Sequence, residues 1–196
     1  MKKFFGLFVL LIVIFSAPVC PGVSSVTVLG VNGIDVEGFG NIRSLGRAYE
    51  VILQSKPSKR FNLTLNFLRD TKYQEEAVKF FLGIDRSKIV RLDLIGINSL
   101  DFLRDKGLDF PNLKILKLYL CVGMTCLDGI EVFKSVEYLN ITECMITTLR
   151  GMDSLLCLRS FKMYSCSRIH SSNKETNLFL QRLGELQING CRYLEV

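Results

Sequence analysis

Cysteine is the residue whose spacing in this sequence could most readily support chemistry. Four of the seven cysteines recur at similar intervals, at Cys121, Cys144, Cys166 and Cys191. Thiols can bind zinc, form disulfides or act as nucleophiles, and their surroundings decide which of these occurs. Each of the four cysteines follows an alternating apolar segment, which indicates a structural position at the end of a buried strand. Buried, unpaired thiols are therefore the favoured interpretation.

Metal and catalytic sites find little further support. The only histidine is His170, in a predicted loop, and a single histidine limits Ser–His and Cys–His designs. Phosphate-binding glycine loops, G-x-S-x-G and H-E-x-x-H are all missing from the sequence. The acidic residues are spread over different predicted strands, as Asp93, Glu137, Glu143 and Glu185 illustrate. We therefore predict no enzymatic activity, no cofactor and no metal.

The segments that carry the cysteines repeat along the chain. In the clearest copy, Val136, Leu139, Ile141 and Cys144 occupy the pattern L-x-x-L-x-L-x-x-C. Copies in register begin at Val23, Arg60, Ile89, Leu113, Val136, Leu158 and Leu183. The copy at Arg60 is weaker because its first position is polar. Alternation within L-x-L is typical of a strand with one buried face, and stacked units can share one core.

The unit resembles that of the leucine-rich repeat family. The segment from Val136 to Met163 is most similar to the short-unit, internalin-like type, and cysteine in place of asparagine is closer to the cysteine-containing subclass. The resemblance covers residues 23–196. It implies an α/β fold, a solenoid of about seven units with a parallel β-sheet on its concave side and an irregular or helical convex side. It also implies that the repeating cysteine points inward and satisfies the backbone of the turn.

The first two units are longer than the others, and each has room for a helix. Apolar residues at helical spacing before Pro57 predict the first helix, and a similar group predicts the second. The first group is Ile42, Leu45, Ala48, Tyr49, Ile52 and Leu53, and the second is Tyr73, Ala77, Val78, Phe80 and Phe81. The very first copy is assigned to Val23, Val26, Val28, Val31 and Ile34.

Disulfide pairing is the alternative to free thiols for the repeating cysteines. Neighbouring cysteines in a parallel sheet would stand about 5 Å apart, which is within disulfide range, so pairing along the repeat stays open. Cys126 and Cys157 lie outside the repeating position and are the better candidates for pairing or reactivity.

Residues 1–22 have the layout of a secretory signal peptide. Lys2 and Lys3 precede an apolar run from Phe4 to Phe15, which small and turn-forming residues follow. We therefore predict a secreted protein whose mature domain spans 23–196, with an uncleaved membrane anchor as the alternative. The net charge is +6 and has no basic cluster, so no nucleic-acid partner is expected and no membrane association after cleavage.

A protein partner of unknown identity is the expected ligand. The exposed positions of the predicted strands are rich in tyrosine and arginine, the residue types that carry most interface energy. The predicted partner-binding residues are Arg91, Lys117, Tyr119, Tyr138, Lys162 and Tyr164. Asn62 and Asn140 begin N-x-T sequons and are candidate glycosylation sites on the same strands.

A structural role is the competing prediction. The last apolar position of the pattern, Leu194, lies close to the final residue, Val196, and no polar capping segment follows it. An exposed apolar end is a liability in a repeat protein. The alternative function is therefore an assembly element that associates weakly with itself through its C-terminal repeat.

Overall fold

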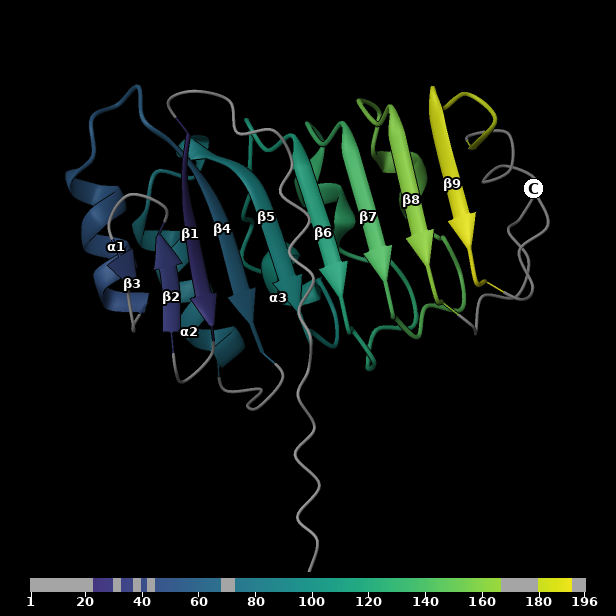
Figure 1. Cartoon of the computed structure of the whole chain (residues 1–196), viewed down its shortest axis with the longest axis horizontal. Coiled ribbons are helices and arrows are strands. Elements are labelled where there is room, and N and C mark those ends of the chain that lie inside the picture. Colours follow the sequence, from purple (N-terminus) through teal and green to yellow (C-terminus); the bar gives the residue numbers. More distant parts are fainter. Residues whose placement is uncertain are drawn as a thin grey trace, which may run out of the picture.

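One β-sheet organises the protein. The computed structural model describes residues 23–29, 33–36, 40–41, 45–67, 73–166 and 180–191. Within them a nine-stranded sheet has the order β3-β2-β1-β4-β5-β6-β7-β8-β9 (Figure 1). Six consecutive parallel pairings connect β1 Val23–Leu29, β4 Arg60–Asn66, β5 Ile89–Ile95, β6 Ile115–Tyr119, β7 Tyr138–Thr142, β8 Ser160–Tyr164 and β9 Glu185–Asn189. The predicted mixed α/β architecture with a parallel sheet is confirmed.

The two faces of the sheet differ in burial. In β4 and β6, buried and half-buried side chains alternate strictly, as the two-residue period of a strand requires. Leu63 and Leu65 of β4, like Leu116 and Leu118 of β6, are at most 2% exposed. The helices cover this apolar face and lie behind the strands in Figure 1. The alternating polar residues therefore point to the opposite side.

The connections between strands become simpler along the chain. The early ones hold α1 Leu45–Gln54 and α2 Tyr73–Gly83, which confirms the two predicted helices. Ile42 lies outside the described residues. The connection with α2 also holds the single turn η1 Arg86–Lys88. In the next three connections, which the structure describes in full, the helical elements are the single turns α3 Asp101–Arg104, η2 Ile130–Phe133 and η3 Met152–Ser154. Contacts join α1 to α2, α2 to α3, α3 to η2 and η2 to η3, so the helical layer is continuous.

Phenylalanine rings form the centre of the helical layer. The ring of Phe81 lies 5.0 Å from that of Phe110, which lies 5.1 Å from that of Phe133. All three are at most 1% exposed. Phe110 and Phe133 each precede the first apolar residue of the next unit by three positions, and their carbonyl groups accept hydrogen bonds from the N–H groups of Leu113 and Val136. We call Phe81, Phe110 and Phe133 the phenylalanine spine.

A left-handed residue ends each strand from β5 to β9. These residues are Gly96, Leu120, Glu143, Ser165 and Gly190, with φ between +52° and +73°. The N–H of each of the first four donates to a carbonyl of the next strand, as from Leu120 to Thr142 at 3.0 Å. The chain then turns inward, so the following residue enters the core. That following residue is Ile97, Cys121, Cys144, Cys166 or Cys191.

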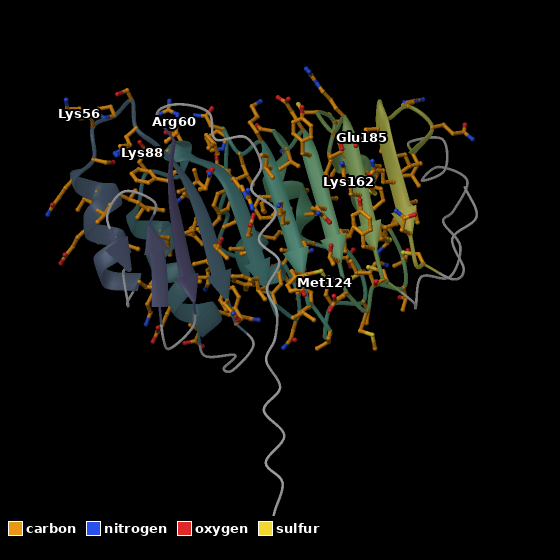
Figure 2. All side chains as sticks on the ribbon, viewed as in Figure 1. Lys56, Arg60, Lys88, Met124, Lys162 and Glu185 are labelled. Atoms are coloured by element: carbon orange, nitrogen blue, oxygen red, sulfur yellow. The ribbon has the colours of Figure 1, made fainter. Side chains whose placement is uncertain are left out.

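A buried lysine holds the C-terminal end of α1. The Lys88 side chain is in a residue only 6% exposed, and its ammonium group donates to the carbonyl oxygens of Ile52 and Ser55 at 3.1 and 3.0 Å. It also donates to the Ser55 hydroxyl at 3.1 Å. The last carbonyl groups of a helix have no partner within the helix, so a cation from the next connection satisfies them here. Figure 2 shows Lys88 beside this part of the molecule.

Two details of the predicted repeat are wrong. Ile34 lies in β2 Gly33–Val36, which pairs antiparallel with β1 and places Ile34 opposite Val28. β3 Gly40–Asn41 extends the sheet beyond β2. The chain thus folds back as a hairpin and covers the edge that β1 would otherwise leave unpaired. Val31 lies outside the described residues.

The second correction concerns the first position of the second unit. Arg60 pairs with Val23 of β1, as the predicted register requires, but toward β5 it is Phe61 that pairs with Ile89, and Phe61 is fully buried. A register shift follows at once, because Asn62 pairs with Arg91 and Val90 has no opposite residue. Val90 is thus the extra residue of a β-bulge between β4 and β5, and the buried Phe61 takes the place opposite Ile89 that the polar Arg60 was expected to fill.

Candidate partner-binding face

The side of β4 to β9 opposite the helices is the candidate site, and we call it the open face. Its side chains form three rows that run across the strands. The first row is Asn62, Arg91, Ile115, Tyr138, Ser160 and Glu185; the middle row is Thr64, Asp93, Lys117, Asn140, Lys162 and Gln187; the third row is Asn66, Ile95, Tyr119, Thr142, Tyr164 and Asn189. The structure places all six predicted partner-binding residues on this face.

Arg91 is held by its neighbour on the same strand. Its Nε and one terminal nitrogen donate to the two carboxylate oxygens of Asp93 at 2.8 and 2.6 Å. This hydrogen bonding raises the pKa of Arg91. Because both oxygens and the fork of the guanidinium are engaged, Arg91 is less available to a partner than the sequence suggested.

Lys162 is also paired. Its ammonium group lies 2.6 Å from a carboxylate oxygen of Glu185 on β9, and Figure 2 shows the two side chains together on the open face. The other oxygen of Glu185 accepts a hydrogen bond from the Ser160 hydroxyl at 2.7 Å. The bond to Glu185 raises the pKa of Lys162, and the bond from Lys162 lowers the pKa of Glu185.

Lys117 differs from both. It lies in the middle row between Asp93 and Asn140 and is half-buried. Burial lowers its pKa, since removal of a cation from water disfavours the charged form. Within the described part of the chain, no hydrogen bond or ion pair holds its ammonium group.

The three predicted tyrosines have different surroundings. Tyr138 is 47% exposed. The hydroxyl group of Tyr164 donates to the side-chain oxygen of Gln187 at 2.6 Å, and that of Tyr119 approaches a carboxylate oxygen of Glu143 at 3.4 Å. Burial, together with Glu143, raises the pKa of Tyr119. Tyr119 and Tyr164 lie in the same row with Thr142 between them.

Both candidate glycosylation sites lie on the open face. Asn62 is half-buried in β4, and Asn140 is half-buried in β7. The Thr142 hydroxyl donates to the side-chain oxygen of Asn140 at 2.9 Å, so the amide nitrogen of Asn140 points away from that bond. The repeat register already predicted that Asn140 lies beside Lys117, but the sequence gave no sign of the hydrogen bond from Thr142 that engages the amide oxygen of Asn140.

Three of the acidic residues to which the sequence assigned no role each form an ion pair with a different basic side chain. Asp93 binds Arg91, Glu185 binds Lys162, and Glu137 lies 2.6 Å from the ammonium group of Lys114. None of these contacts brings two carboxylates together, as paired acid–base chemistry would require. His170 lies outside the described residues.

The cysteines are free thiols where the structure describes them. Cys121, Cys144 and Cys166 are at most 1% exposed, and the sulfur of each lies 3.3–3.4 Å from the carbonyl oxygen two residues earlier. The hydrogen bond with Cys121 and burial raise the pKa of Cys144, and burial raises the pKa of Cys166 to about 12. Cys144 and Cys166 are therefore protonated and poorly nucleophilic near neutral pH, whereas the hydrogen bond with Cys144 lowers the pKa of Cys121. Cys126 is half-buried and Cys157 is exposed.

Two further findings concern only the described residues. They contain no group of three or more histidine, cysteine or acidic side chains suited to a metal ion. No helix among them is long and apolar enough to cross a membrane.

Comparisons with protein-family models, curated proteins and solved structures found nothing that matches the chain. The geometry of the open face is therefore the main guide to function.

Proposed function

We propose that the protein is a secreted leucine-rich repeat solenoid of about seven units that binds a protein partner through the open face and performs no catalysis. The proposal is supported by one observation above all. Six side chains chosen from the sequence for their chemistry lie on one helix-free face, in three adjacent rows across β5 to β8. The regular left-handed turn and the inward residue after it support the repeat assignment.

The open face has the features of a protein interface. Tyr138 is a large exposed aromatic residue, and Tyr119 and Tyr164 stand one row apart from the charged middle row. Tyrosine loses little side-chain entropy on binding and offers both an apolar ring and a polar tip. The six strands of the open face, at about 4.8 Å spacing, and their side chains can provide the roughly 800 Å² per partner of a standard interface.

Affinity capture tests this function. The full chain is expressed in a eukaryotic secretory host in which N-glycosylation is inhibited, and it is used as bait on cell extracts and cell surfaces, beside a variant with Tyr119→Ala, Tyr138→Ala and Tyr164→Ala. We expect a partner that the wild type retains and the folded triple variant loses, because truncation of central aromatic residues commonly costs at least about 2 kcal/mol each at hot spots. Equal capture by both proteins would place the binding surface elsewhere. Recovery of processed protein from the medium would also test the predicted signal at residues 1–22.

A second candidate function is self-association, and an observation at β9 favours it. In the described sheet β9 pairs only with β8. Its core-facing residues Leu186 and Ile188 are half-buried, whereas Phe161 and Met163 at the same positions of β8 are fully buried.

Sedimentation velocity over a wide concentration range tests this second candidate. If two copies join through β9, the measured average mass should rise with protein concentration. Ile188→Lys should weaken that rise, because it places a charge at the contact. A constant monomer mass at high concentration would contradict self-association and leave partner binding unaffected.

A further inference from the structure

Two of the basic side chains of the open face already form ion pairs within the protein. Arg91 is neutralised by Asp93 through two hydrogen bonds, and Lys162 is neutralised by Glu185. Each pair joins side chains of the open face itself. A ligand that approached these pairs would have to displace a carboxylate before it could bind either cation.

Lys117 carries the unbalanced charge at the centre of the face. Its nearest carboxylate across the sheet is Asp93 on β5, but both oxygens of that group already accept hydrogen bonds from Arg91. The ammonium group is half-buried and holds no hydrogen bond or ion pair within the described residues. A partly desolvated cation without an anion is costly, and an incoming carboxylate would remove that cost.

Asn140 places a second donor beside it. Lys117 and Asn140 are paired across β6 and β7, so their side chains are direct neighbours in the middle row. Because the Thr142 hydroxyl donates to the amide oxygen of Asn140, the amide nitrogen is directed elsewhere, and no described residue accepts a bond from it. Two adjacent groups therefore offer donors only.

A carboxylate fits this pair better than a phosphate does. It has two acceptor oxygens and one negative charge, which match two neighbouring donors and one unpaired cation. Phosphate carries more charge and is commonly held by the fork of an arginine, and the arginine nearest to the pair, Arg91, is occupied by Asp93. Tyr119 lies two residues after Lys117, and Tyr138 lies two residues before Asn140, so both tyrosines are on the same face as the donors. Their rings can shield the contact from water.

We infer that Lys117 and Asn140 form the recognition point for an aspartate or glutamate side chain of the protein partner. The inference rests on the proposed function and specifies the chemistry of the partner. The contact is made at the centre of the open face, between the neutral pairs Arg91–Asp93 and Lys162–Glu185. A glycan attached to the Asn140 amide nitrogen would occupy one of the two donors, so the recognition point works only in chains that carry no glycan there.

Selection from a random peptide library tests the inference and does not require an identified partner. The full chain is produced in a host without N-glycosylation, and peptides displayed on phage are selected against it. We expect an acidic residue to be enriched at one position of the peptides that need Tyr119, Tyr138 and Tyr164 for binding. Replacement of that acidic residue by its amide should weaken binding about tenfold.

Matched variants separate the local contact from general charge. Lys117→Gln should abolish the acidic preference, whereas Lys117→Arg should retain it. Lys134→Gln, which removes an exposed cation at the end of η2 in the helical layer, should also leave the preference in place. Thermal unfolding and circular dichroism confirm that each variant is folded before peptides are compared.

The outcomes distinguish the two proposals. Tyrosine-dependent peptides without an acidic preference, or with one that survives Lys117→Gln, would overturn the inference while partner binding by the open face stands. A library that yields no tyrosine-dependent peptide would contradict both.

Discussion

Single residues of this protein act mainly through burial. The repeating cysteines illustrate this, because the turn before each one directs a thiol into the core beside backbone carbonyl groups. Thiols are small and weakly polar, so they fill this position without requiring a strong partner. Burial in the core also changes how readily such a thiol loses its proton, so the free energy of unfolding depends on pH.

A pH dependence follows for Cys166. Burial raises its pKa to about 12, whereas a thiol in an unfolded chain titrates near about 8.5. Between these values the unfolded chain loses a proton that the folded chain keeps, so the free energy of unfolding falls as pH rises. The slope from this group is at most about 1.4 kcal/mol per pH unit. Urea unfolding of wild type and Cys166→Ala between pH 8 and 11 measures it.

The variant should show the shallower decline, since it lacks the titrating thiol. Ile146→Val is the matched control, because it also removes part of a fully buried side chain but no titrating proton, and should leave the slope unchanged. Parallel curves for wild type and Cys166→Ala would show that the thiol titrates alike in both states.

The sequence predicted which residues lie on the open face, but not which of its charged side chains form ion pairs. The two-residue period of a strand was enough to place Arg91, Lys117 and Lys162 on one side of the sheet. Which lysine lacks an anion depends on partners elsewhere, namely Asp93 two residues after Arg91 and Glu185 on the next strand. Side-chain geometry selects these pairs, and a repeat pattern does not contain it.

At the scale of elements, ring contacts within the phenylalanine spine pack each connection between strands against the next one. Phe110 lies between Phe81 and Phe133 and contacts both rings, so it links the long early connections to the short later ones. Phe110→Ala should lower the free energy of unfolding by about 3–5 kcal/mol, because it removes a fully buried ring and leaves a cavity. Chemical denaturation measures this loss.

Leu156→Ala is the control for this substitution. Leu156 is 85% exposed, so its truncation should change stability by no more than about 0.5 kcal/mol. A loss for Phe110→Ala as small as that of the control would mean that the helical layer closes around the missing ring.

Local sequence signals determined which elements could be predicted. Helices α1 and α2 have several apolar residues at helical spacing, and both were predicted close to their observed bounds. The hairpin strand β2 was missed because Ile34 also satisfied the repeat pattern, and only pairing with β1 reveals its direction. The bulge at Val90 was missed for a related reason, since register depends on both strands.

At the scale of the whole molecule, the sheet has two unlike edges. The hairpin strands β2 and β3 follow β1 at one edge, while β9 forms the other edge of the described sheet. The order of the parallel strands could be predicted, because successive units of one kind must stack in sequence. The antiparallel strands at the first edge could not, since they do not obey the repeat.

The equivalent turns before β6 and β7 have a consequence for how the length of the chain can change. Leu113 and Val136 each begin a unit, and the N–H of each donates the same hydrogen bond to a phenylalanine carbonyl three residues earlier. Loss of residues 113–135 in the gene would join Asn112 to Val136 and restore that bond with Phe110 as acceptor. Insertion or deletion of a whole unit at this junction would thus leave the hydrogen bond of the turn in place, whereas a length change inside a strand would shift the alternation of buried and exposed residues.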